Sequence, residues 1–242
     1  MSNSSQANQT LFKLPQFHKF MKLASLFSGG KDSVYSAYLV KQEGHELVCL
    51  ITIHSENPDS FMFHTPSIKK TETQAKVMQI PLIIQKTKGE KEEELKDLKK
   101  AIKEAIKKYK IQGIVTGALH SDYQVSRIQK ICDKLKIKCL NPLWHKDETE
   151  YLKELIKNKF KVIITGVAAF PLDETWLGRE IDNSFITDVK ELKSQYKIHP
   201  AGEGGEFETF VLNCPLFKKT LRITDKKISG KDNAWRMEIE VQ

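Results

Sequence analysis

The sequence has few cysteines and no long apolar run. Its 242 residues include four cysteines, Cys49, Cys132, Cys139 and Cys214, and no two of them form a CxxC pair. This spacing argues against a zinc ribbon or an iron–sulfur cluster, and a disulfide framework is not expected in a chain of this length. No apolar stretch approaches the ~18 residues that a membrane-spanning helix needs. We therefore expect buried, reduced thiols in a protein that does not enter a membrane.

The first twenty residues lack the apolar core of a signal peptide and are rich in Ser, Asn and Gln. We expect residues 1–20 to form a loose extension that takes no part in the fold. Together with the reduced cysteines, this indicates a cytoplasmic location.

Arginine is also scarce, although the net charge is +8. An excess of lysine attracts anions, but arginine more often recognises the shape of a phosphate. Much of the lysine lies in residues 88–110. Apolar residues recur there at spacings of three and four, at Leu95, Leu98, Ile102, Ile106 and Tyr109. This pattern predicts a helix with one buried stripe and a solvated charged face, a reading that we favour over a nucleic-acid patch.

Strands and helices alternate through the first part of the sequence. The predicted strands are residues 22–27, 46–53, 81–84, 111–116 and 137–140. The predicted helices are residues 31–43, 88–110 and 122–135, and one that starts with Thr65 as its cap and Pro66 as its first residue. Continuously apolar strands separated by helices predict a doubly wound, parallel, Rossmann-like α/β sheet, which binds ligands beyond the carboxyl ends of its strands.

The pattern changes after Trp144. A helix over residues 149–158 and a strand over residues 161–167 precede an irregular stretch, and the tail then becomes rich in β-formers. We therefore expect one domain over residues 21–145 and a smaller C-terminal α+β domain over residues 146–242.

The most informative stretch is SGGKDS, residues 28–33, between the first predicted strand and helix. It has neither the spacing of a Walker A loop nor that of the dinucleotide motif GxGxxG. Gly29 and Gly30 let the backbone approach a ligand closely, and backbone N–H groups at a helix start favour a multiply charged anion. Ser28 and Ser33 add hydroxyls, Lys31 adds a positive charge, and Asp32 can hold Mg²⁺ or fix the loop. The alternative is a tight turn that only caps the helix.

SGGKDS after a first strand resembles the signature of the PP-loop ATP-pyrophosphatases. Three later stretches, Thr116–Cys132, Asp173–Asp182 and His199–Phe217, are similar to the motifs of the diphthine–ammonia ligase family in its short archaeal form. GEGGEFET, within the third stretch, is the most specific of these motifs. One departure is Ser67 after HTP, where the family carries Asn.

The resemblance implies an enzyme that amidates diphthine on translation elongation factor 2. It would use ATP with Mg²⁺ and ammonium, and it would form diphthamide, AMP and pyrophosphate through an acyl-adenylate. The implied catalytic residues are Lys31, Asp32 and Glu206, with Asp32 also holding Mg²⁺. The nucleotide would be bound by Ser28, Gly29, Gly30, Lys31, Asp32, Ser33, Gly117 and Arg127. The acceptor would be bound by Glu203, Gly204, Gly205, Glu206, Glu208, Thr209 and Trp176.

Several of these residues also have a purely structural interpretation. Gly117 is equally a plain turn glycine, and Trp176 is more often a core residue than a ring for a cation. Ser121 and Gln124 fit an S-x-x-Q capping box, which makes Gln124 structural. On a strand, Glu206 and Glu208 would share one face. The histidines lack metal-ligand spacing, so we assign no metal other than the magnesium of the nucleotide.

Two other functions are compatible with the loop. One is a tRNA-thiolating PP-loop enzyme, which the basic composition favours and the lack of CxxC opposes. The other is a regulator that binds ATP without turnover. Nucleic acid is not the expected partner, and the sequence is compatible with a homo-oligomer. Free ammonium is the expected nitrogen donor.

Overall fold

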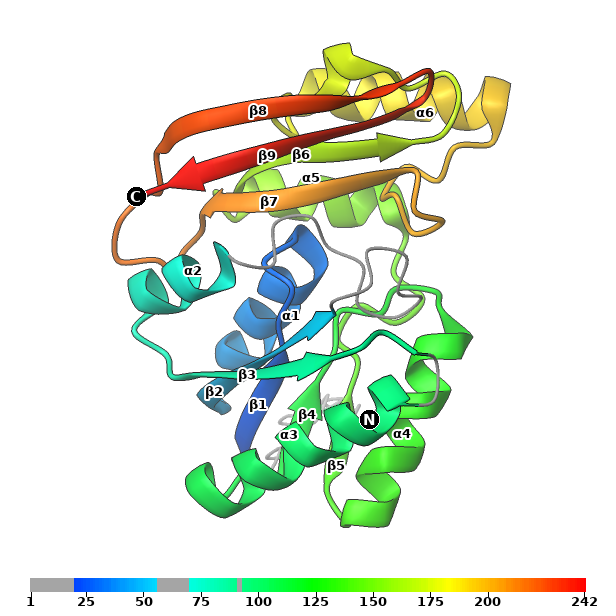
Figure 1. Cartoon of the computed structure of the whole chain (residues 1–242). Helices are drawn as coiled ribbons and strands as arrows, with labels where there is room; N and C mark the ends of the chain where they lie inside the picture. Colours follow the sequence, from blue (N-terminus) through cyan, green and yellow to red (C-terminus); the bar gives the residue numbers. More distant parts are fainter. Residues whose placement is uncertain (1–19, 56–69, 91–92) are drawn as a thin grey trace, which may run out of the picture.

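The computed structural model describes residues 20–55, 70–90 and 93–242, in which the chain forms two sheets. A five-stranded sheet has the order β3-β2-β1-β4-β5, and a four-stranded sheet has the order β7-β6-β9-β8 (Figure 1). The predicted extension, apart from its last residue, lies outside the described residues. The predicted cap Thr65, with Pro66 and Ser67, lies outside them too.

The first sheet is parallel throughout, as the apolar strands predicted. Its strands are β1 (Lys22–Leu26), β2 (Glu46–Ser55), β3 (Leu82–Thr87), β4 (Gly113–Val115) and β5 (Lys138–Leu140). Its helices are α1 (Lys31–Gln42), α2 (Thr71–Met78), α3 (Glu93–Tyr109) and α4 (Asp122–Leu135). The strand order reverses between β1 and β4, and ligands bind at such a switch point in open α/β sheets. The Rossmann-like prediction is confirmed.

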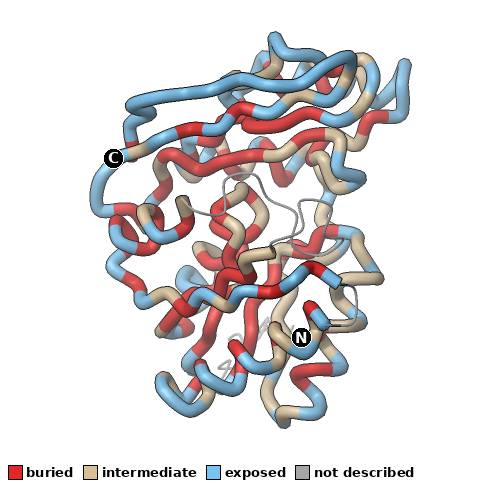
Figure 2. Tube along the Cα trace, in the orientation of Figure 1, coloured by how far each residue is buried: buried red, intermediate tan, exposed pale blue. Residues whose placement is uncertain are grey.

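Helices cover both faces of this sheet. On one face Leu98 and Ile102 of α3 and Ile128 of α4 pack against Cys49 and Ile51 of β2. Within the predicted stripe of the lysine-rich helix, Leu98 and Ile102 are buried, and Leu95, Ile106 and Tyr109 are partly buried. The lysines of the helix are exposed or partly exposed, whereas Glu94 is buried. Helix α1 packs on the opposite face, where it belongs to the larger of the apolar clusters. Buried residues run through β1, β2 and β4 (Figure 2).

The second sheet is antiparallel and makes up the C-terminal part of the fold. Its strands are β6 (Lys161–Ala168), β7 (Phe207–Asn213), β8 (Ile223–Lys231) and β9 (Ala234–Val241). It is accompanied by α5 (Glu148–Lys157), the short 3₁₀ helix η2 (Glu174–Trp176) and α6 (Asn183–Tyr196).

Helix α6 was not predicted from the sequence. Its start is marked by Asp182, whose carboxylate accepts a hydrogen bond from Phe185 N at 2.8 Å. Apolar residues then recur at helical spacing, at Phe185, Ile186 and Val189, and all three are buried. An N-cap aspartate before this pattern was the signal available in the sequence.

The two sheets meet at the edge of β7. Val211 N donates to Gly29 O at 3.2 Å, and Gln74 Nε2 of α2 donates both to Gly29 O at 3.0 Å and to Val211 O at 2.9 Å. On the other side Tyr35 OH of α1 donates to Glu154 Oε2 of α5 at 2.8 Å. The glycine loop after β1 is therefore fixed between the two sheets. Among the described residues, no helix has the length and apolar character that crossing a membrane requires.

Candidate functional site

The loop Ser28–Ser33 keeps its shape through its own serines. Gly29 has a φ of +82°, a conformation that glycine adopts without strain. Ser28 N donates to Ser33 Oγ at 3.2 Å, and Ser33 Oγ donates to Gly30 O at 3.1 Å. Both hydroxyls thus stabilise the turn in addition to lining the cavity above it.

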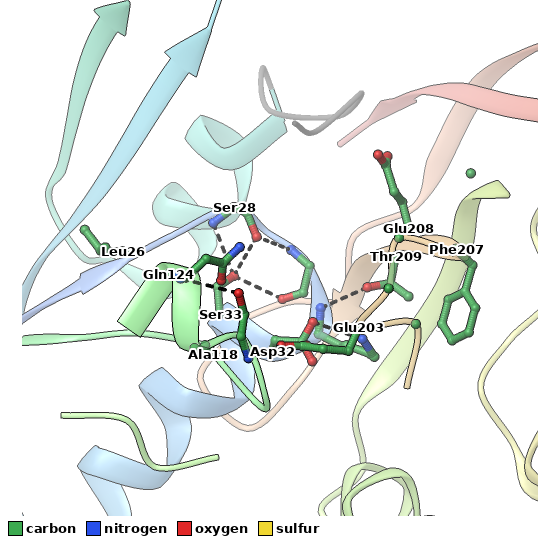
Figure 3. A pocket seen from close by; sticks show the side chains of 18 of the residues that line it. Leu26, Ser28, Asp32, Ser33, Ala118, Gln124, Glu203, Phe207, Glu208 and Thr209 are labelled. Carbon is green, nitrogen blue, oxygen red and sulfur yellow. Dashed lines mark hydrogen bonds and ion pairs between the residues drawn. The ribbon is translucent and has the colours of Figure 1, made fainter. Parts of the chain in front are cut away.

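Helix α1 receives its cap from the second sheet. Its N-cap residue is Gly30, which has no side chain to accept a hydrogen bond. Instead, Lys31 N donates to Thr209 Oγ1 of β7 at 3.1 Å (Figure 3). Thr209 was predicted to bind the acceptor, but its hydroxyl contacts the glycine loop. The GEGGEFET motif therefore supports the loop directly.

Lys31 and Asp32, which both line the cavity, form a partly buried ion pair. Lys31 Nζ lies 2.9 Å from Asp32 Oδ2, and the lysine side chain is only 4% exposed. Tyr151 OH donates to Asp32 Oδ1 at 2.9 Å. Burial, together with the nearby Asp32 carboxylate, raises the pKa of Tyr151 well above its ordinary value, so Tyr151 remains a hydrogen-bond donor. Asp32 thus accepts one hydrogen bond on each of its oxygens.

A cavity of about 760 Å³ lies beyond the carboxyl ends of the parallel strands, where the fold predicts a ligand (Figure 3). This volume falls in the range of small-molecule sites. Most of the predicted site residues line it: Ser28, Gly30, Lys31, Asp32, Ser33, Gly117, Glu203, Gly204, Gly205, Glu208 and Thr209. Gly29, Arg127, Trp176 and Glu206 are not among the lining residues.

Gly117 lies directly against the start of α1. A Cβ at this position would be 2.8 Å from Asp32 C and 2.9 Å from Ser33 N, so any other residue would force this backbone to move. The glycine therefore permits the β4–α4 turn to pack against the loop, and it lines the cavity as well. The packing role of Gly117 is confirmed, and its assignment to the nucleotide stays a prediction.

The acidic loop crosses to the start of α4. Glu203 Oε1 accepts hydrogen bonds from His120 N at 3.0 Å and from Ser121 N at 3.1 Å, where the helix dipole favours a carboxylate. Ser121 Oγ accepts from Gln124 N at 3.4 Å, which confirms half of the predicted capping box. In a complete capping box the Gln124 side chain would accept a hydrogen bond from Ser121 N. Here Glu203 accepts it instead.

Of the last two glutamates in the motif, the structure places only Glu208 on the cavity. The strand starts at Phe207, so Glu206 lies outside it, and the expectation that Glu206 and Glu208 share a strand face is wrong. Glu206 Oε1 accepts from His199 N at 2.9 Å. Burial raises the pKa of Glu208 from 4.5 to about 7, although Arg236 opposes the shift. The catalytic assignment of Glu206 stays a prediction.

Family models match both parts of this structure. The diphthamide synthase N-terminal domain matches residues 21–139, and the diphthamide synthase C-terminal domain matches residues 147–241. The chain belongs to the diphthamide synthase family. It is 34% identical over 230 residues to the diphthine–ammonia ligase of Bos taurus, an alignment that covers 86% of this chain and 85% of that protein.

Two further proteins match over a smaller part of the chain or with lower identity. A tRNA-specific 2-thiouridylase from Helicobacter pylori is 41% identical, but over 63 residues, which are 26% of this chain and 17% of that protein. A solved structure of a predicted tRNA methyltransferase subunit from Methanocaldococcus jannaschii is 19% identical and covers 81% of this chain and 98% of its own, with a TM-score of 0.41. A TM-score this low says nothing of function.

Two side chains implied by the family resemblance, Arg127 and Trp176, are not among the residues that line the cavity, although Arg127 packs on Tyr123, which does line it. The Arg127 guanidinium lies 3.5 Å from the centre of the Tyr123 ring and donates to Tyr123 O. Trp176 packs edge-on against Phe185, with ring centres 5.7 Å apart, and carries Arg179 over its face. Their assignments to nucleotide and acceptor stay predictions, and the packing of Trp176 agrees with the core interpretation.

The fold brings together three possible ligand side chains to which the sequence assigned no metal. Ligand atoms of His120, Glu148 and His199 lie within 4.8 Å of one another. However, His199 Nδ1 accepts hydrogen bonds from Ala201 N at 3.2 Å and Glu203 N at 3.5 Å, so the neutral ring carries its proton on Nε2. Burial lowers the pKa of His199, which favours this neutral form. The imidazole of His199 thus has no lone pair available for an ion.

The structure adds residues from the second sheet that sequence reasoning missed. Gly166 of β6 and Trp235 and Arg236 of β9 line the same cavity as the diphthamide synthase motifs. The sequence predicted only that this tail is rich in β-formers. Only the pairing of β9 with β6 brings its first residues to the cavity.

Proposed function

We propose that this chain is an ATP-dependent carbon–nitrogen ligase that amidates the carboxylate of diphthine on translation elongation factor 2. The products would be diphthamide, AMP and pyrophosphate. The observation that carries the proposal is the hydrogen bond from Lys31 N to Thr209 Oγ1, which joins SGGKDS to GEGGEFET at one cavity. Relatives that cover most of the chain are named diphthine–ammonia ligases.

The chemistry takes two displacements. A carboxylate oxygen of diphthine attacks the α-phosphorus of ATP, the bond to the β-phosphate oxygen breaks, and pyrophosphate leaves. Ammonia then attacks the acyl carbon, the bond from that carbon to the AMP oxygen breaks, and AMP leaves as the amide forms. Both steps depend on positioning and on neutralisation of phosphate charge.

The glycine loop is suited to the phosphates. It places backbone N–H groups at the start of α1, and Lys31 adds a positive charge on the cavity wall. Asp32 fits a Mg²⁺ ion, because each carboxylate oxygen accepts one hydrogen bond in the fold and retains a further lone pair. Bound there, Mg²⁺ would neutralise phosphate charge. We assign Ser28, Gly30, Ser33 and Gly117 to the nucleotide as well.

We assign the acceptor and the ammonium ion to the other wall of the cavity. Glu203, Gly204, Gly205 and Glu208 lie there, in the part of the chain that we treat as a second domain from residue 146. A cytoplasmic elongation factor is the protein partner in this proposal, and ammonium is the nitrogen donor, since no glutaminase motif is recognisable in the sequence.

One assay tests the proposal against its alternatives. The full chain is incubated with ATP, Mg²⁺, ammonium and unamidated elongation factor 2, and AMP, pyrophosphate and the modified residue are measured. We expect AMP only when the unamidated factor is present, together with conversion of its carboxylate to an amide. AMP formation that depends on tRNA would favour the thiolating function, and no turnover would favour a regulator. Glutamine acting as well as ammonium would contradict the assigned donor.

A further inference from the structure

A carboxylate and a guanidinium lie on either side of one glycine in the second sheet. Gly166 of β6 pairs with Glu208 of β7 on one side and with Arg236 of β9 on the other. Residues paired across neighbouring strands project from the same face of a sheet. Because neighbouring strands are about 4.8 Å apart, the backbones of Glu208 and Arg236 are separated by about 10 Å. Because the glycine has no side chain, β6 itself places nothing in the space between them, and the Glu208 side chain extends over the glycine.

This space belongs to the cavity that contains the glycine loop. All three residues line it. Glu208 leaves β7 in the opposite direction from Phe207 (Figure 3). A Cβ built on Gly166 would lie 3.4 Å from Glu208 Oε2, so the carboxylate reaches over the glycine. Arg236 is exposed, whereas Glu208 is more deeply buried.

The charges match the two reactants that the ligase must bring together. Arginine binds carboxylates through paired N–H donors, and a buried carboxylate binds a small cation. The amidation joins one carboxylate to one ammonium ion. The exposed Arg236 is accessible to a side chain carried on another protein, and the deeper Glu208 is accessible to a small ion.

We propose that Glu208 and Arg236 form a two-sided subsite over Gly166, in which Arg236 binds the carboxylate to be amidated and Glu208 binds the ammonium ion. This inference rests on the proposed function and names residues that carry it out. Glu208 takes one proton from ammonium, and the resulting ammonia attacks the acyl carbon. The C–N bond forms, AMP leaves with the electrons of the broken C–O bond, and the nitrogen loses its second proton to water.

The two residues act at different steps, so their variants should fail at different steps. In Arg236→Ala the carboxylate is not held for attack on ATP. We expect the burst of pyrophosphate that the unamidated factor causes in the absence of ammonium to slow by about thirtyfold or more. Glu208→Gln should keep this burst within about threefold of wild type and raise the KM for ammonium at least about tenfold. ATP affinity, measured by calorimetry, should not change in either variant.

Matched controls are available in β9 and just before β8. Arg222→Ala and Glu238→Gln remove one exposed arginine and one exposed glutamate that do not line the cavity, and both should behave as wild type. Gly166→Ala should slow amide formation with its fold retained, because its Cβ meets nothing closer than 3.4 Å.

The outcomes separate this inference from the proposed function. A wild-type chain that forms no amide contradicts the function itself. A wild-type chain that amidates, with an Arg236→Ala variant that keeps its burst or loses ATP affinity, overturns the subsite alone. Loss of the burst in Glu208→Gln overturns it as well.

Discussion

Lys31 N and Thr209 Oγ1 lie 3.1 Å apart, although 178 residues separate them in the chain. Through this hydrogen bond, a residue of the second sheet caps the helix that follows the glycine loop. The motif first assigned to the acceptor thus shapes the nucleotide loop too. Mutations in GEGGEFET can therefore alter ATP binding without any contact to ATP.

Thr209→Val tests this relationship. Valine keeps the shape of threonine but cannot accept the N–H of Lys31, so we expect a loss of about 1–2 kcal/mol in the free energy of unfolding and weaker ATP binding. Urea denaturation and calorimetric titration with ATP measure the two effects. Thr209→Ser should retain both properties. Unchanged ATP affinity in the valine variant would show that the cap does not shape the loop.

Asp32 is a second position where sequence and structure give different expectations. An aspartate in a glycine-rich loop is expected to be exposed and to contribute little to the free energy of unfolding. In the fold it accepts hydrogen bonds from Tyr151 OH and pairs with the buried Lys31. We expect Asp32→Ala to abolish AMP formation and also to lower the free energy of unfolding by about 2–3 kcal/mol, because the buried ammonium loses its partner.

Tyr151→Phe separates these two effects of Asp32. It removes only the hydrogen bond to Asp32 and should retain most of the AMP formation. An Asp32→Ala variant as stable as wild type in urea would contradict the structural role.

The raised pKa of Glu208 predicts a pH dependence of stability. Burial raises this pKa from 4.5 in the unfolded chain to about 7 in the fold, so the folded state binds more protons between these values. Stability therefore falls as the pH rises through this window, by an amount on the order of 1–3 kcal/mol. Urea denaturation at pH 5 and pH 8 should show a smaller fall for Glu208→Gln than for wild type. An equal fall in both proteins would mean that a group other than Glu208 causes the pH dependence of stability.

Gly117 provides a test of packing. Its substitution by alanine places a Cβ within 3 Å of the backbone at Asp32 and Ser33, which must then move. We expect Gly117→Ala to lower the free energy of unfolding by about 1–3 kcal/mol and to weaken ATP binding by displacing the loop. Gly166→Ala, which meets only ordinary contacts, is the control for stability. A Gly117→Ala variant with wild-type stability would mean that the turn shifts freely.

A comparison of Glu206→Gln with Glu208→Gln decides which glutamate serves the chemistry. A catalytic electrostatic contact is typically worth about 2–4 kcal/mol. Because Glu208 lines the cavity and Glu206 binds His199 N, we expect the larger loss of amide formation for Glu208→Gln. A larger loss for Glu206→Gln, with His199 undisturbed by NMR, would support the role first assigned to Glu206.

The sequence by itself determined the parallel sheet and the place of the loop. Continuous apolar strands and the buried stripe of the lysine-rich helix are local patterns, and each follows from the periodicity of a single segment. The glycines after the first strand likewise fix the start of α1. The motifs were sufficient to indicate the family, since each one is contiguous in the chain.

Only the tertiary structure decided which side chains meet at the cavity. Thr209 reaches the loop, Glu203 reaches α4, and Glu208 and Arg236 flank Gly166 because strands far apart in sequence pair in one register. Glu208 lies within β7, paired with Gly166, and lines the cavity, whereas the carboxylate of Glu206 accepts a hydrogen bond from His199 N and does not line it. Register is set by the packing of the whole sheet, and a shift of one residue turns every side chain to the other face.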